Sequence, residues 1–179
     1  MSKLFVDEIA SKTGATDAMT IDSTGRILTP ARPVFSARGS VASWVSVADG
    51  TEITIVLDTA DINVGGYFNT STYKFTAPIA GLYQVQATTY LRNNNGTLSD
   101  SGSYGYTRIR KSGSAGSEAT TALSIHGYTN APDNDQTHNH AGIFNMAAGD
   151  YVSLHISCSG GGTSEYYGVY CSMSGYLIG

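Results

Sequence analysis

Apolar and polar residues alternate along most of this chain with a period of two. The pattern is clearest over residues 82–91, where Tyr83 and Val85 face one way and Gln84 and Gln86 face the other. Residues 51–57 repeat it with isoleucines and a leucine at every second position. Alternation of this kind predicts strands that have one face in a core and the other against water.

Similar short segments follow to the end of the chain. They lie at residues 104–110, 122–126, 141–146, 151–158 and 169–178, and Gly, Asn and Ser turns separate them. No window keeps a helical period over ten residues, and the 21 glycines recur too often for long helices. Only 13% of the residues are charged, and 12 are tyrosines, which suits packing on pleated faces. We therefore predict an all-β sandwich or jelly roll over residues 33–179.

Residues 1–32 differ in sequence pattern from the rest of the chain and form a predicted N-terminal arm. Two short extended pieces are joined by Gly turns, and Pro30 and Pro33 then stiffen the chain. The arm is too short and too polar to build its own core. It is either a flexible tail or a segment that folds against neighbouring subunits. The apolar residues that it would use for attachment are Val6, Ile9, Met19 and Ile21.

Four stretches of the chain resemble the C1q/TNF-like jelly-roll family, in the order that the family has them. They are Pro-Val-Phe-Ser-Ala-Arg from residue 33, the Gly-Gly, Ala-Pro and Gly-x-Tyr run within 55–83, the Ala-Gly-Asp-Tyr-Val run within 144–154, and Gly-Tyr-Leu-Ile-Gly at 175–179. Val85 departs from the pattern, because the family often has an aromatic residue there. No collagen repeat precedes the domain, which favours a viral or bacterial variant over a complement-like protein.

The resemblance implies a homotrimer in which one sheet of each jelly roll packs near a threefold axis. Tyrosine suits such an interface, since its ring covers a large area and its hydroxyl reaches water. We expect core or trimer contacts from Phe35, Tyr67, Phe68, Tyr83, Phe144 and Tyr176.

The arm also resembles the amino-terminal arms of bacteriophage tail-fibre and virion-surface proteins, through its Val-Asp-x-Ile and Ala-Met-Thr-Ile-Asp pieces. This predicts a phage virion-surface structural protein whose arm binds other virion proteins, either as capsid decoration (cement) or as a short head fibre. The alternative is a tail-fibre adhesin that recognises a host surface glycan or protein. A secreted C1q-like ligand is the third choice, and the lack of a hydrophobic segment at the start counts against it. We expect synthesis in the host cytoplasm and a place on the virion surface.

Charge and hydropathy limit the classes of partner that we expect for this chain. The net charge is −4 and no large Lys/Arg cluster occurs, so nucleic acid is not expected as a partner. No apolar run approaches the roughly 20 residues that a membrane-spanning helix needs, so membrane insertion is not expected.

His138 and His140 form the sharpest local motif for chemistry. Residues two apart on a strand face the same way, so in a trimer six imidazoles could meet on the axis and bind a transition metal. The alternative is that both lie in a polar loop. Asp133 and Asp135 could supply oxygen ligands for calcium, but they lack the Gly and downstream Glu of a known calcium loop.

The remaining reactive residues do not predict catalysis. Neither a Gly-x-Ser-x-Gly elbow nor a phosphate-binding loop is present, so we predict no enzyme activity. Cys158 and Cys171 both fall at inward positions of strands. They are expected to be buried thiols in a protein made in a cytosol, with a disulfide across the core as the alternative.

Overall fold

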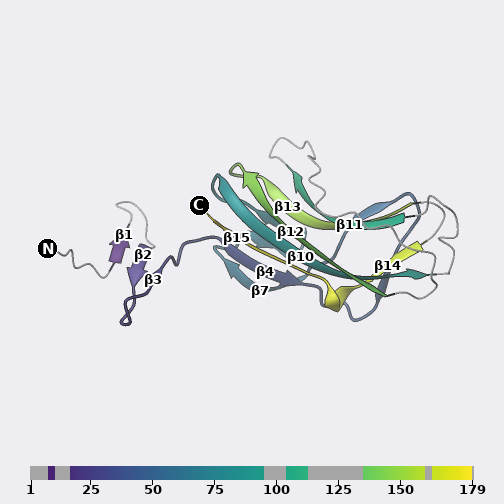
Figure 1. Cartoon of the computed structure of the whole chain (residues 1–179), viewed down its shortest axis with the longest axis horizontal. Helices are drawn as coiled ribbons and strands as arrows, with labels where there is room; N and C mark the ends of the chain where they lie inside the picture. The colour runs from purple at the N-terminus through teal and green to yellow at the C-terminus, as the bar shows by residue number, and fades with distance from the viewer. Residues whose placement is uncertain (1–7, 11–16, 95–103, 113–134, 160–162, 179) are drawn as a thin grey trace.

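The computed structural model describes residues 8–10, 17–94, 104–112, 135–159 and 163–178 of the chain. Two curled sheets pack face to face into a sandwich, and a small third sheet lies in the N-terminal arm, apart from it (Figure 1). In the described part of the chain, the only helical piece is the 3₁₀ turn η1 (Gly168–Tyr170). The predicted all-β jelly roll with an extended arm is confirmed.

The larger sheet has seven strands. They are β5 (Trp44–Val47), β14 (Thr163–Tyr167), β10 (Gly81–Asn94), β15 (Ser172–Leu177), β4 (Val34–Arg38), β7 (Thr59–Val64) and β12 (Gln136–Met146). The long strand β10 organises the sheet, since β12 pairs along one side of it while β15 and then β14 pair along the other. Because η1 separates β14 from β15, the last strand begins at Ser172, later than the predicted 169.

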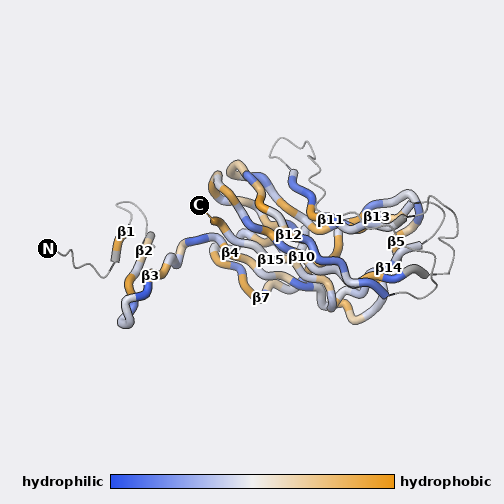
Figure 2. Tube along the Cα trace, viewed as in Figure 1, coloured by the Kyte–Doolittle hydropathy of each residue, from blue (hydrophilic) through white to orange (hydrophobic). Residues whose placement is uncertain are grey.

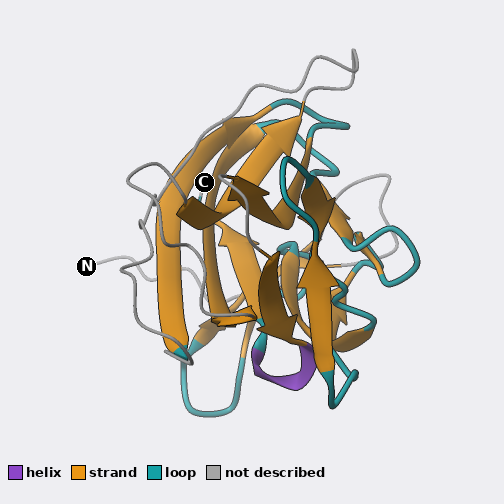
Figure 3. Cartoon of the chain, turned by 90° about the vertical axis from the view of Figure 1, so that its right-hand side faces the viewer, coloured by secondary structure: helices purple, strands orange, loops and turns teal. Residues whose placement is uncertain are grey.

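The smaller sheet has five strands. They are β11 (Tyr104–Ser112), β13 (Tyr151–Ser159), β9 (Lys74–Thr76), β8 (Phe68–Asn69) and β6 (Glu52–Thr54). β13 lies at its centre and pairs with β11, β6 and β9. Viewed from the end, the two sheets form the two walls of the sandwich (Figure 3).

The core fills the space between the sheets. Phe35 stacks on Phe75 with ring centroids 4.4 Å apart and on Phe68 at 5.4 Å. Phe75 also contacts the ring of Tyr83, whose hydroxyl donates to the carbonyl of Ile79. Apolar residues accordingly alternate with polar ones along the strands (Figure 2). These rings come from both sheets, so their packing joins the sheets directly.

The run from Asn63 to Tyr83 builds one corner of this core. Gly65 and Gly66 both adopt positive φ, which the turn after β7 requires. The side-chain amide of Asn63 then bonds both the N–H and the carbonyl of Phe68 across that turn. The clamp fixes Phe68 at the position where its ring stacks on Phe35.

The arm holds the three-stranded sheet β1 (Glu8–Ala10), β2 (Asp17–Ile21) and β3 (Ile27–Leu28). Ile9 lies opposite Met19 in the β1–β2 pair. The turn between β2 and β3 is closed by the Asp22 carboxylate, which accepts from the backbone N–H groups of Thr24 and Arg26. The side chain of Thr24 also donates to this carboxylate and has the largest effect on it. Together these hydrogen bonds lower the pKa of Asp22 to about 2.

Candidate functional site

The sequence-predicted core and trimer residues divide into two groups. Phe35, Phe68, Tyr83 and Phe144 are buried between the sheets. Tyr67 and Tyr176 are exposed, at 37% and 41% respectively. Tyr67 lies in the turn after β7, whereas Tyr176 lies on the outer side of the seven-stranded sheet.

That outer side, which we call the exposed face, carries a row of apolar side chains at one end. The pairing registers place Ile143 of β12, Tyr176 of β15 and Val64 of β7 level with one another across the sheet. Ile143 is 66% exposed. We call the exposed apolar residues at this end the apolar belt; they are Ile62, Val64, Leu82, Ile143, Tyr176 and Ile178.

The middle of the exposed face is polar and carries short side chains. The side-chain amide of Gln86 donates to the Ser174 hydroxyl at 3.2 Å, and the Thr88 hydroxyl donates to Asn139 at 2.9 Å. These four groups come from three neighbouring strands and satisfy one another. The centre of the face is therefore a shallow polar hollow beside the apolar belt.

Four aromatic rings meet at the other end of the exposed face and form what we call the aromatic cluster. Trp44 stacks on Tyr90, with centroids 5.6 Å apart, and Tyr167 stacks on Tyr170 at 5.2 Å. The two stacked pairs meet edge to face, since Trp44 contacts Tyr167 at 73° and Tyr90 contacts Tyr170 at 83°. Aromatic pairs favour both geometries, so the four rings hold one another in place.

Polar interactions hold the side chains of the aromatic cluster in place. The guanidinium of Arg92 lies 4.0 Å from the Trp44 ring centroid and is held there by Glu165, with an Nε–Oε2 distance of 2.8 Å. The Tyr90 hydroxyl donates to Asp135 at 2.6 Å, and this bond raises the pKa of the tyrosine. The Tyr167 hydroxyl donates to the carbonyl of Ala42.

Sequence reasoning missed this cluster. Its members come from β5, β10, β14 and η1, so only the sheet pairing brings them together. One signal was present: Tyr166, Tyr167 and Tyr170 are crowded near the break between two strands. Tyr166 is buried, whereas Tyr170 is 60% exposed, so the crowding reflects two different environments.

The structure places His138 and His140 inside the sandwich. Both lie on β12 and not in a loop, and they face the same way, as their spacing predicts. The Thr107 hydroxyl lies 2.7 Å from His140 Nε2 and 3.2 Å from His138 Nδ1, and 3.2 Å from the Thr89 hydroxyl. The even-numbered residues of β12 point into the sandwich, so neither ring reaches the exposed face where a threefold axis was expected.

Other candidate metal ligands do not complete a site. Within the described residues, no group of three or more His, Cys, Asp or Glu side chains is arranged to hold a metal ion. Asp135 is exposed and bonds Tyr90, while Asp133 lies outside the described residues. In the arm, Ile9 and Ile21 are exposed and Met19 is half-buried; Val6 lies outside the described residues.

The two cysteines are buried thiols in the structure. Cys158 is on β13 and faces inward with the apolar residues of that strand. Burial raises the pKa of the Cys171 thiol to about 11. A neutral, enclosed thiol is a poor nucleophile, so Cys171 acts as core packing.

The outer side of the five-stranded sheet is charged. The Glu52 carboxylate binds Arg108 in a bidentate manner and also Arg110, and His155 lies 3.3 Å away. Burial opposes ionisation of Glu52, but the hydrogen bonds and charges of the two arginines outweigh it and lower its pKa. Lys111 shares the inward-facing side of β11 with Thr107 and Ile109, and its ammonium lies 3.1 Å from the Asp150 carboxylate and donates to the carbonyl of Asn145 on β12.

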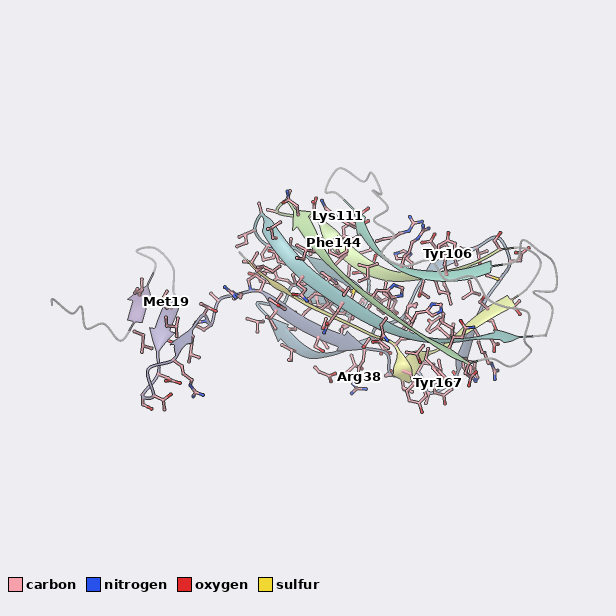
Figure 4. All side chains as sticks on the ribbon, viewed as in Figure 1. Met19, Arg38, Tyr106, Lys111, Phe144 and Tyr167 are labelled. Atoms are coloured by element: carbon pink, nitrogen blue, oxygen red, sulfur yellow. The ribbon has the colours of Figure 1, made fainter. Side chains whose placement is uncertain are left out.

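Figure 4 shows the side chains on the ribbon, with Met19 in the arm and Phe144, Tyr106 and Tyr167 on the sandwich. No helix of the described residues is long and apolar enough to cross a membrane.

The sequence matches no protein-family model, and it matches no curated protein. The fold does match solved structures. It is similar to the globular domain of zebrafish complement 1qA protein, with a TM-score of 0.55 at 12% identity over 83% of this chain and 98% of that chain. It is also similar to Eiger TNF from S. frugiperda, with a TM-score of 0.58 at 11% identity over 83% and 93% of the two chains. A third similar structure is murine APRIL, with a TM-score of 0.56 at 14% identity over 82% and 98%.

Three similar structures of this kind, at sequence identities this low, establish the architecture. The expected C1q/TNF-like fold is thereby confirmed, and the chain has a C1q/TNF-like jelly-roll fold.

Proposed function

We propose that this chain forms a trimeric, non-enzymatic head, in which three jelly rolls pack through the exposed face of the seven-stranded sheet. The apolar belt is the observation that carries the proposal. Five of its six side chains lie on strands of this sheet and Ile178 directly follows β15, and all six are more than a third exposed. An apolar patch of this extent on a soluble protein marks an interaction surface.

The C1q/TNF-like fold and the edge position of β12 support the packing of three copies. β12 lies at the edge of the sheet beside β10, and Ile143 projects from it. In a ring of three, the edge strand of one copy lies against the exposed face of the next, and each belt is covered. A heterologous contact of this kind closes when the rotation per subunit is one third of a turn.

We further propose that the head is displayed on a bacteriophage virion and that the arm attaches it. The described arm residues support this, because Ile9, Ile21, Ile27 and Leu28 are exposed on a sheet of three short strands. So small a sheet gains little stability by itself, and its apolar residues need a partner. Capsid decoration or a short head fibre suits a small head on an arm better than a long tail fibre does.

The trimer is tested by sedimentation and by light scattering of the full chain. The expected mass is three times the 18.8 kDa of one chain. Ile143→Asp places a charge in the apolar belt and should give monomers that remain folded by circular dichroism. Thr76→Asp is the matched control, since Thr76 is exposed on β9 of the other sheet, and it should stay trimeric. A wild-type protein that is monomeric at micromolar concentration would refute the trimer.

The virion role is tested separately. Deleting residues 1–32 should leave a soluble trimer that no longer joins the particle, and cryo-electron microscopy of the intact particle should show the head on the capsid. Normal incorporation of the truncated head would contradict the role of the arm. Density at the tail alone would contradict capsid decoration and favour the adhesin.

A further inference from the structure

The three-stranded sheet of the arm has one apolar face. Ile9 of β1 lies opposite Met19 of β2. Ile21 of β2 lies opposite Ile27 of β3. Partners across two strands share a face, and so do residues two apart on one strand, such as Met19 and Ile21. The pairing therefore gathers these four side chains, which we call the arm stripe, on one face of the sheet.

The opposite face of this sheet is more polar. Thr20 and Leu28 lie opposite each other on it, beside the turn that the Asp22–Arg26 ion pair closes. The arm stripe lies in water in the single chain, because the arm lies apart from the sandwich (Figure 1). Three of its four side chains are more than a third exposed: Ile27 at 64%, Ile9 at 49% and Ile21 at 37%.

The arm joins the head at the row of residues that the proposed trimer covers. β4 begins at Val34, which pairs with Tyr176 on one side and lies opposite Val64 on the other. Only residues 29–33 separate β3 from β4, a link that reaches at most about 20 Å, and a turn within it shortens that reach. Three copies that pack through the apolar belt therefore hold their arms close together, at a high effective concentration.

The width of the arm sheet suits the packing of three copies. Neighbouring strands lie about 4.8 Å apart, so a sheet of three strands is about 14 Å wide. A triangle with sides of about 14 Å has its centre about 4 Å from each side, close to half of the roughly 10 Å between packed sheets. Three arm sheets that form the sides of a triangle thus leave room for one layer of side chains from each.

We infer that the arm stripes of three copies pack against one another and form the apolar centre of a short stem on the threefold axis of the head. The partner is a second copy, because the stripe carries no charged side chain and the short link brings equally apolar faces within reach. Leu28 and the outer edges of β1 and β3 stay on the outside of the stem, where virion proteins can bind them.

The stem rests on the proposed trimer and deepens it, since it names what covers the apolar face of the arm. Four side chains from each copy bury too little area to hold three chains together without the heads. Ile143→Asp should therefore still separate the chains, whereas an intact stem should strengthen a trimer that the heads have formed.

The first experiment compares two neighbouring residues of β3 in the full chain. Ile27→Asp places a charge at the centre of the stem, and burying an unpaired charge is costly. Sedimentation over a dilution series should show that the trimer dissociates at a concentration about tenfold higher, or more, than the wild type does. Leu28→Asp is the matched control, because Leu28 is 46% exposed on the opposite face, and it should dissociate as the wild type does.

A second experiment tests the geometry of the stem by cross-linking. Met19→Cys brings three thiols toward the axis, and oxidation with diamide should join two of the three chains of each trimer through a disulfide. Thr20→Cys, on the opposite face of the same strand, should give few or no linked chains. The native Cys158 and Cys171 are buried in the head and should not react.

The outcomes separate the stem from the trimer itself. A wild-type chain that is monomeric would refute the proposed trimer. A wild-type trimer that Ile27→Asp leaves unchanged would refute the stem alone, and loss of particle attachment in that variant would then show that the arm stripe binds a virion protein. Equal cross-linking of Met19→Cys and Thr20→Cys would also refute the stem, since it would mean that the arms meet without a preferred face.

Discussion

The outer sides of the two sheets differ in where their side chains find partners. On the five-stranded sheet, Glu52 binds Arg108 and Arg110, so these charges are balanced within the chain. On the seven-stranded sheet, Ile143 and Tyr176 project from neighbouring parts of the apolar belt and remain exposed. The charged groups of one face find partners within the chain, whereas the other face carries the exposed apolar belt through which we propose that copies of the chain pack. The comparison shows why the proposed self-association uses only one of the two sheets.

The largest loss of stability should come from a substitution in the core between the two sheets. Phe35→Ala removes the ring that stacks on Phe68 and Phe75, and we expect the free energy of unfolding to fall by about 3–5 kcal/mol. Urea unfolding followed by circular dichroism measures it. Phe35→Leu keeps most of the volume and should cost clearly less. Equal losses from both variants would show that ring stacking is not what joins the sheets.

A smaller loss is expected from the charged face. Glu52→Gln leaves Arg108 and Arg110 without their shared carboxylate, in a partly buried position, and should cost about 1–3 kcal/mol in urea unfolding. The oligomeric state should not change, because the proposed assembly does not use this face. Asp61→Asn is the matched control: its pair with Arg38 is about half exposed, and its loss should cost at most about 0.5 kcal/mol.

The interaction of Glu52 with Arg108 and Arg110 also makes the stability of the fold depend on pH. The pKa of Glu52 is lower in the folded chain than in the unfolded chain, so its contribution is fully present above the ordinary carboxyl pKa near 4.5. The contribution is lost as the pH falls through the lowered value. Stability measured from pH 7 down to pH 3 should fall less steeply in Glu52→Gln than in the wild type. Identical slopes would mean that the two arginines do not stabilise the ionised carboxylate.

The smallest effect on the single subunit should come from the apolar belt. Tyr176→Ser removes an exposed ring whose hydroxyl donates to Gln84 on the same face. We expect the free energy of unfolding of the monomer to change by less than about 0.5 kcal/mol, since no core contact is lost. Association should weaken by about tenfold or more, as measured by sedimentation over a dilution series. A large loss of monomer stability with unchanged association would reverse the comparison between the faces.

Much of the sandwich followed from local sequence. The alternation in residues 82–91 correctly predicts which side of β10 is buried, because side chains on a strand point to opposite faces in turn. The Gly-Gly pair at 65–66 and Gly149 mark turns that need positive φ. The inward parity of Cys158 also follows from the alternation in β13.

The sites were harder to predict, because each is assembled across strands. The spacing of His138 and His140 predicts a shared face but not which face, and the pairing of β12 with β10 turns both rings toward Thr107. Glu52 meets Arg108 only because β6 and β11 both pair with β13. Short-range patterns carry no information on such pairings.

By itself, therefore, the sequence determined strands, turns, the buried side of strands such as β10 and β13, and a resemblance to one jelly-roll family. These depend on interactions between residues that are close along the chain, such as pleating and backbone conformation. Only the tertiary structure decided that one sheet carries an apolar belt at one end of its outer face, that the other has a charged outer face, and that Trp44, Tyr90, Tyr167 and Tyr170 form one cluster. Those features depend on strand order and register, which bring together residues up to 126 positions apart along the chain, from 44 to 170.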